Sequence, residues 1–207
     1  MILYKTIKEE AVAEQVIEKS RFITYIKPVE TREEADEFIK KIKNMNKSAT
    51  HNVPAMVIGD KFQIQWASDD GEPQGTSGAP IVQMLVNEGV TNVVVVVTRY
   101  FGGIKLGTGG LVRAYTSSAK LGLEAGQVCE VKELASIKYK TDYKYLSIFE
   151  NMAKNQPFDI GEIEFAEKIT IQFLTEPENI ANIIEHLAGV TSGTGEVVSK
   201  EVTTVKV

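Results

Sequence analysis

The sequence predicts an α+β protein with two domains, at residues 1–127 and 128–207. Three observations support this prediction. A length of 207 residues is enough for two domains of about 100 residues each. The composition, 43% hydrophobic and 25% charged, is typical of a packed globular chain. From residue 131 onward the predicted elements follow the order strand, helix, strand, strand, helix, strand, which is that of a ferredoxin-like domain.

The elements of the first domain begin with two strands, at Ala11–Glu18 and Arg21–Val29. Thr31 then opens a helix, and Glu34 three residues later completes a capping box. The apolar residues at helical spacing that form the buried face of this helix are Ala35, Phe38, Ile39, Ile42 and Met45.

The rest of the first domain alternates strands and helices. Strands are predicted at Val53–Gly59, Phe62–Ala67 and Asn92–Thr98, the last because a run of valines is typical of a strand buried on both faces. Helices are predicted from Pro80 to Asn87, with proline in the first turn, and from Gly109 to Leu121. The glycine-containing stretch that follows, residues 122–127, is interpreted as the linker between the domains.

The second domain has six predicted elements. They are a strand at Val131–Lys140, a helix at Asp142–Asn155, strands at Phe158–Phe165 and Lys168–Leu174, a second helix, and a last strand at Glu196–Val207. Thr175 and Glu178 are interpreted as the capping box of the second helix. RNA-recognition modules share this order, but the strand at Lys168–Leu174 lacks their aromatic pattern, so we do not expect this domain to recognise RNA.

Several classes of protein are excluded by the composition. The most hydrophobic run, Val93–Val97, is far shorter than the roughly 18–20 residues that cross a bilayer. The first ten residues lack the pattern of a secretory signal, so we expect a cytoplasmic protein with no membrane contact. The single cysteine, Cys129, cannot form an internal disulfide, and we expect it to be a buried or half-buried hydrophobic residue and not a nucleophile. One cysteine and two histidines exclude a Cys/His-rich zinc site.

The net charge of −5 is unevenly distributed. Residues 1–130 carry 15 basic and 16 acidic side chains, whereas residues 131–207 carry 8 and 12. Such a chain has no overall attraction for nucleic acid, so any contact with RNA must come from a local basic patch. The acidic second domain is better suited to docking a protein partner.

The strongest chemical signal is the segment Arg99–Arg113, which we call the basic glycine-rich loop. A buried strand ends there and a helix begins, an arrangement that presents unpaired backbone N–H groups and the positive end of a helix dipole to an anion. The anion is most naturally a phosphate of a nucleic-acid backbone. The residues expected to bind it are Arg99, Gly102, Gly103, Lys105, Gly107, Gly109, Gly110 and Arg113.

An alternative interpretation of these glycines is that they only make tight turns and allow close packing of helix on strand. The segment is neither a P-loop nor a G-x-G-x-x-G motif. Tyr100 and Phe101 follow the strand directly, and aromatic rings of this kind stack on bases in nucleic-acid-binding proteins. Aromatic residues directly after a buried strand are more often core, and we expect that of these two.

A second segment carries three acids, Asp69, Asp70 and Glu72. Three carboxylates so close in sequence suit a Mg²⁺ ion and, through it, a phosphate. The favoured alternative is a turn in which the acids cap backbone amides or pair with Arg99 or Lys105.

Two further features lie near these acids. The stretch Gly75–Pro80, just before a helix, has the composition of an amide nest, a concavity of backbone N–H groups that binds an anion. His51, in a loop between helix and strand, is a candidate general base. No Ser-His-Asp or Cys-His signature is present, so an enzymatic function lacks a nucleophile.

Taken together, the motifs resemble the signature of the IMPACT family. The segments that carry the resemblance are Lys19–Phe22, Ala49–Asn52, Ser68–Pro73, Gly75–Gly78 and Arg99–Tyr115. They occur in order over about residues 15–120, and the last is long enough to make a chance match remote. Residues 131–207 are similar to the smaller C-terminal domain of the bacterial members.

This resemblance implies a first domain with the fold of the second domain of ribosomal protein S5. That fold also occurs in elongation factor G, next to a ferredoxin-like domain, so the pair implies binding to RNA or the ribosome and a link to translation. Eukaryotic members act on a stress-kinase pathway through an extra RWD domain that this sequence does not include, and that role is not expected here. The family positions, none with a catalytic role attached, map to Ser20, Arg21, His51, Asp69, Asp70, Glu72, Arg99, Lys105 and Arg113.

The sequence therefore predicts a non-enzymatic protein that binds nucleic acid or the ribosome, is linked to regulation of translation, and uses no cofactor. The alternative is a metal-dependent hydrolase or phosphotransferase in which Asp69, Asp70 and Glu72 bind Mg²⁺ and His51 is the base. A third hypothesis, compatible with the first, is docking of a protein partner through the acidic second domain.

Overall fold

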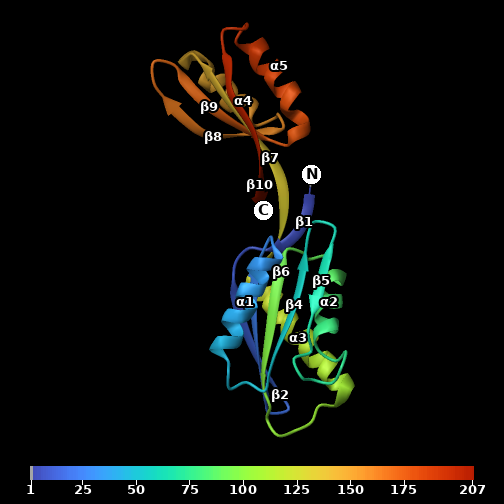
Figure 1. Cartoon of the computed structure of the whole chain (residues 1–207). Helices are drawn as coiled ribbons and strands as arrows, with labels where there is room; N and C mark the ends of the chain where they lie inside the picture. The colour runs from blue at the N-terminus through green and yellow to red at the C-terminus, as the bar shows by residue number, and fades with distance from the viewer. Residues whose placement is uncertain (1) are drawn as a thin grey trace. The chain divides into compact units, whose positions relative to one another are not determined.

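In the computed structural model, which describes residues 2–207, the chain forms two compact units (Figure 1). One comprises Leu3–Glu130, and the other comprises Val131–Val207 together with Ile2. Both combine helices with antiparallel strands, which confirms the predicted α+β class.

The Leu3–Glu130 unit is built around a five-stranded antiparallel sheet of order β2-β3-β6-β4-β5. The strands of this part of the chain are β1 (Ile2–Ile7), β2 (Ala11–Ile17), β3 (Ser20–Pro28), β4 (His51–Ile58), β5 (Ile64–Ala67) and β6 (Val93–Tyr100). The valine run of β6 lies at the centre of the sheet and is fully buried, as its composition predicts. β1 was not predicted from the sequence, and its residue Lys5 forms a parallel bridge to Val90.

Three helices cover the two faces of this sheet (Figure 1). They are α1 (Arg32–Met45), α2 (Gly78–Asn87) and α3 (Gly107–Gly126). Apolar side chains of α1 pack with Met56, Val94 and Val96 on one face, whereas α2 and α3 share a core cluster on the other. The predicted cap of α1 is confirmed, since the hydroxyl of Thr31 accepts a hydrogen bond from the backbone N–H of Glu34 (3.2 Å).

The predicted linker at residues 122–127 is wrong, because α3 continues to Gly126. Gly122 is where α3 approaches β3. A Cβ at this position would lie 2.5 Å from the Cγ2 atom of Thr24, so this glycine permits close packing and does not end the helix. The next residue, Leu123, is buried in the core.

The Val131–Val207 unit follows the predicted order of elements. Its strands and helices are β7 (Val128–Thr141), α4 (Leu146–Met152), β8 (Phe158–Phe165), β9 (Ile169–Thr175), α5 (Ile180–Val190) and β10 (Glu196–Lys206). β7 pairs with both β9 and β10, β8 pairs with β9, and all these pairs are antiparallel. Phe149, Phe173 and Leu187 lie in the core of this unit.

Two local predictions in this unit need correction. The helix expected at Asp142–Asn155 is present but shorter, with a 3-10 turn at Tyr143–Tyr145 followed by α4, which ends at Met152. The capping box of Thr175 and Glu178 does not form, because Thr175 belongs to β9 and its hydroxyl donates to the carbonyl of Pro157. A 3-10 turn at Pro177–Asn179 separates that strand from α5.

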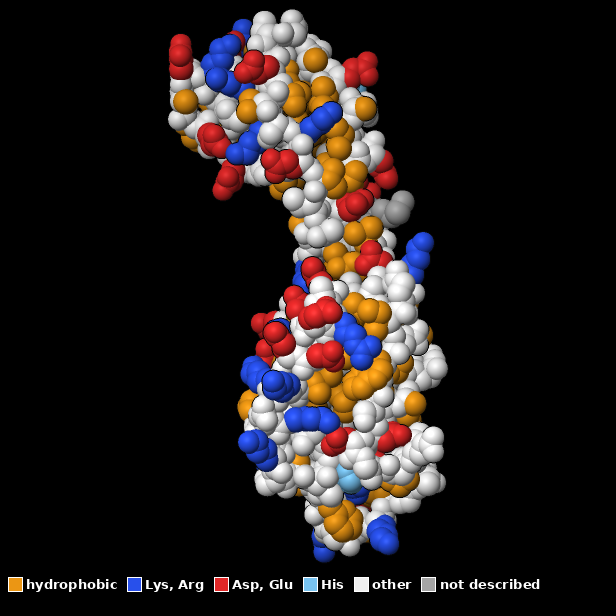
Figure 2. All heavy atoms as spheres, in the orientation of Figure 1, with side chains coloured by type: hydrophobic (Ala, Val, Ile, Leu, Met, Phe, Trp, Pro, Cys, Tyr) orange, Lys and Arg blue, Asp and Glu red, His pale blue; other side chains and the backbone are white. Residues whose placement is uncertain are grey.

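On the face shown in Figure 2, acidic and basic side chains are interspersed over both units. Among the helices of residues 2–207, none combines the length and the apolar character that crossing a membrane requires.

Candidate functional site

Side chains from four of the sequence motifs meet at the end of β6. We call Ser20, His51, Glu72, Arg99 and Tyr115 the Arg99 cluster. Register brings them together: Phe22 on β3 and His51 on β4 both lie opposite Arg99 on β6, which stands between these strands. Residues 79 positions apart in sequence, Ser20 and Arg99, thereby come within hydrogen-bond distance.

Glu72 is the acceptor at the centre of this cluster. Its Oε1 atom accepts hydrogen bonds from Arg99 Nη1 and from the Tyr115 hydroxyl, each 2.7 Å long. Its Oε2 atom lies 3.8 Å from His51 Nε2. Burial, followed by the hydrogen bond to Glu72, raises the pKa of Tyr115, so its hydroxyl remains a donor.

Arg99, one of the residues expected to bind an anion, is buried. Its side chain is 6% exposed, and its guanidinium lies 5.4 Å from the ring centroids of both Phe22 and Phe101. The charge is paired with Glu72, and Nη2 donates to the hydroxyl of Ser20 (3.3 Å). Arg99 therefore holds strand, loop and helix together and is not a free surface cation.

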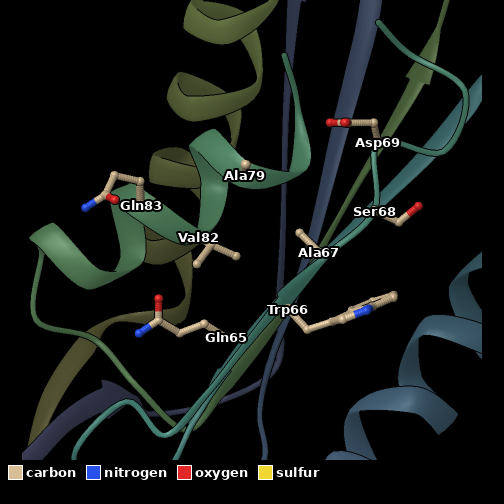
Figure 3. A pocket seen from close by; sticks show the side chains of 8 residues that line it. All are labelled: Gln65, Trp66, Ala67, Ser68, Asp69, Ala79, Val82 and Gln83. Atoms are coloured by element: carbon tan, nitrogen blue, oxygen red, sulfur yellow. The ribbon is translucent and has the colours of Figure 1, made fainter. Parts of the chain in front are cut away.

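Asp69 occupies the predicted amide nest. Oδ1 accepts hydrogen bonds from the backbone N–H groups of Ser77 and Gly78 and from the Ser77 hydroxyl, and Oδ2 accepts one from the N–H of Gly75. In Figure 3 its carboxylate points toward the start of α2. The nest thus holds an anion of the chain itself. Burial acts to raise the pKa of Asp69, but these hydrogen bonds outweigh it and the pKa is lowered.

Asp70 pairs with neither Arg99 nor the amide nest and has partners of its own. Its Oδ1 atom pairs with Lys43 Nζ (2.6 Å) and its Oδ2 atom accepts from the N–H of Asn52 (2.7 Å). Its backbone carbonyl lies 2.8 Å from His51 Nδ1. His51, proposed above as a base, is thus fixed between Asp70 and Glu72.

The three carboxylates of Asp69, Asp70 and Glu72 therefore face separate partners, as the alternative of capping and pairing predicts. Within residues 2–207, no group of three or more His, Cys, Asp or Glu side chains is arranged to hold a metal ion. The Mg²⁺ cluster, the less favoured of the two interpretations of this segment, is not formed among these three acids, because each already neutralises a helix terminus, a lysine or an arginine.

Several glycines of the basic glycine-rich loop are required by its backbone. A Cβ on Gly102 would lie 2.0 Å from the carbonyl oxygen of Lys19, and its N–H donates to the Ser20 hydroxyl. Gly103 and Gly107 have positive φ angles, +86° and +70°. For these three positions, turn geometry and close packing give a sufficient reason for glycine.

The first turn of α3 is the open part of this loop. Its N-cap residue, Leu106, makes no side-chain capping bond, so the N–H groups that begin the helix have no partner of that kind. Lys105 and Arg113 are exposed, and their side chains have no hydrogen-bond or ion-pair partner among residues 2–207. Gly109 and Gly110 lie in this turn, between the two cations.

Lys105 lies between two hollows. One, which we call the α3 pocket, has a volume of about 350 Å³ and is lined by residues that include Glu72, Arg99, Phe101, Leu106 and Leu111. The other, of about 450 Å³, lies along α3 and includes Arg113. A further hollow of about 380 Å³ lies between β5 and α2, away from both cations (Figure 3).

The two aromatic residues of the loop differ. Tyr100 is half-buried and its hydroxyl donates to Asn46 Oδ1 (3.1 Å). Phe101 was expected in the core, and that prediction is wrong, because 47% of its surface is exposed. Tyr115 was missed as a member of the site. The feature that could have identified it is its position on the buried face of α3, because a buried tyrosine hydroxyl requires a hydrogen-bond partner.

Comparison with known proteins places this site in a recognised domain. The family model described as the Impact N-terminal domain matches residues 18–123, a range that includes every member of the Arg99 cluster. A solved structure, described as a crystal structure of a hypothetical protein, is 28% identical. It aligns over 95% of this chain and 96% of its own length with a TM-score of 0.61.

Three relatives match nearly the whole chain. IMPACT family member YvyE of Bacillus subtilis is 42% identical over 97% of this chain and 92% of its own length. An IMPACT family member of Haemophilus influenzae is 37% identical over 93% of this chain and 95% of its own. IMPACT family member YigZ of Escherichia coli is 30% identical over 89% of this chain and 92% of its own length.

Proposed function

The chain belongs to the IMPACT family, and on this basis we propose that it is a non-enzymatic protein that binds nucleic acid or the ribosome and acts in the regulation of translation. The family is generally linked to translation. The observation that carries the proposal is the start of α3, where an uncapped helix terminus lies between two unpaired cations, Lys105 and Arg113.

The chemistry of this surface favours a phosphate. Free N–H groups at a helix start and the positive end of its dipole attract an anion. The side chains of Lys105 and Arg113 form no ion pair within the described residues, in contrast to Arg99, although Glu18 lines the same hollow. The site is local, so it binds a phosphate without requiring a basic protein, which is consistent with a net charge of −5.

The proposal includes the two fold assignments. The strand neighbours β10-β7-β9-β8 and the order of elements in the Val131–Val207 unit support a ferredoxin-like domain. For the Leu3–Glu130 unit, the match to the Impact N-terminal domain supports a fold like the second domain of ribosomal protein S5.

Binding of the purified protein to short RNA strands, RNA duplexes and ribosomes over a salt series tests this proposal. Lys105→Glu and Arg113→Glu should each weaken binding regardless of nucleotide sequence, and each lost phosphate contact should reduce the salt slope by about 0.7–0.9. Lys61→Glu makes the same charge change at an exposed lysine in the turn between β4 and β5, and should leave binding nearly unchanged. Equal affinities for the Lys105 and Lys61 variants would contradict the proposal.

A further inference from the structure

The size of the α3 pocket limits what enters it. Its volume of about 350 Å³ lies near the lower end of the range for ligand sites, roughly 300–1,000 Å³. Pro73, Leu106 and Leu111 supply apolar wall. A cavity of this size and character suits a single planar ring and not an extended duplex surface, in which the bases are stacked and paired.

Phe101 supplies an exposed aromatic face at this pocket. Nearly half of its surface is exposed, at 47%. The guanidinium of Arg99 lies over its ring, 5.4 Å from the centroid, and the backbone N–H of Phe101 donates to Thr50 Oγ1 (3.0 Å). Because Arg99 is itself fixed by Glu72, the ring is held in place, as a base-stacking platform must be.

The charges of the pocket are divided between its interior and its edge. Inside, Arg99 and Glu72 form an ion pair of 2.7 Å, which leaves no net charge there and suits a neutral ring. Lys105 lines this pocket and also the neighbouring hollow, which contains Arg113 and one acid, Glu18. The uncapped N–H groups at Gly107 and Thr108 lie beside Lys105, so this edge suits a phosphate.

We propose that the α3 pocket holds one unpaired base of a single-stranded nucleic acid, stacked on Phe101. The adjoining phosphate binds Lys105 and the start of α3, and the backbone continues toward Arg113. This inference rests on the proposed function and specifies its ligand, since a base inside a duplex does not reach the pocket.

The test compares three labelled RNA ligands of equal length by fluorescence anisotropy with the full chain. They are a single strand, its duplex, and an abasic strand that keeps every phosphate. The intact single strand should bind most tightly, and both the abasic strand and the Phe101→Ala variant should lose about 5- to 150-fold in affinity, the range for one stacked base. In both cases the salt slope of binding should equal that of the unaltered protein with the intact single strand, because no phosphate contact is lost.

A matched control is Phe165→Ala, which truncates another exposed phenylalanine (66% exposed) in the Val131–Val207 unit and should leave affinity unchanged. Equal binding of abasic and intact strands, or of strand and duplex, would overturn the base-pocket inference. The phosphate site would still stand if Lys105→Glu weakened all three ligands. Absence of binding to any of them at low salt would overturn the proposed function as well.

Discussion

At the level of single residues, Glu72 joins segments that lie far apart in the sequence. It accepts from Arg99 on β6 and from Tyr115 on α3, and it faces His51 on β4. Because Glu72 and Arg99 are both almost fully buried, each depends on the other for compensation of its charge. The pair therefore fixes the loop from which Phe101 and Lys105 extend.

We predict that Glu72→Gln destabilises the protein by about 3–5 kcal/mol, since it leaves the Arg99 charge buried without its counter-charge. Urea unfolding measures this change. Glu88→Gln is the control, because Glu88 pairs with Lys120 at an exposed position and such pairs contribute about 0–1 kcal/mol. Similar losses in the two variants would show that the buried pair does not hold the site together.

Asp69 gives a prediction of pH dependence. Its pKa is lowered in the folded chain, so its contribution to stability is complete above the pKa of an unfolded aspartate, about 3.9, and is lost as the pH falls through the lower folded value. Asp69→Asn should cost about 1–3 kcal/mol at neutral pH, because the amide carries no charge and its –NH2 group cannot accept the hydrogen bonds that one carboxylate oxygen accepts.

Unfolding of this variant and of the parent is to be measured at neutral pH and below pH ~4. The difference in their free energies of unfolding should be smaller in acid. Asp60→Asn, at an exposed turn, is the control and should show no such convergence. A gap that stays constant with pH would mean that the charge of Asp69 does not stabilise the nest.

At the level of elements, α3 contains glycines with opposite roles. A Cβ added to Gly109, in the open first turn, would lie 4.0 Å from its nearest neighbour, the side chain of Arg113. A Cβ added to Gly122 would lie only 2.5 Å from the side chain of Thr24. One end of the helix is thus accessible to a ligand, and the other is packed tightly against β3.

These glycines predict opposite effects of the same substitution. Gly109→Ala should be neutral or stabilise by up to about 1 kcal/mol, because alanine favours a helix. Gly122→Ala should destabilise by about 1–3 kcal/mol, the cost of overpacking. Thermal unfolding of both variants measures the contrast, and a stabilised Gly122 variant would mean that the contact with Thr24 relaxes.

At the level of the whole molecule, a net charge of −5 gives no overall attraction for nucleic acid, and acidic and basic side chains are interspersed on the face shown in Figure 2. The Val131–Val207 unit is acidic, with 8 basic and 12 acidic side chains over residues 131–207. If Lys105 and Arg113 supply the phosphate contacts, the logarithm of the binding constant should fall with the logarithm of salt with a slope of about −1.4 for a single strand. A much steeper slope in the same titration would reveal a second basic surface.

Local sequence patterns were sufficient to predict the α+β class, the buried valine strand, the cap of α1 and the order of elements after residue 131. All of these depend on residues that are neighbours along the chain, where periodicity and capping act. The IMPACT family was also recognisable from its motifs, because those motifs are continuous stretches.

The partners of the motif residues, in contrast, depend on contacts that form only in the folded chain. Asp69, Asp70 and Glu72 are adjacent in sequence and suggested one metal site, yet three separate elements neutralise them. Strand register placed Arg99 in the interior, and the loop placed Phe101 outside. Charge pairing and burial depend on contacts between residues distant along the chain, and for this reason local patterns did not reveal which cations remain free to bind a ligand.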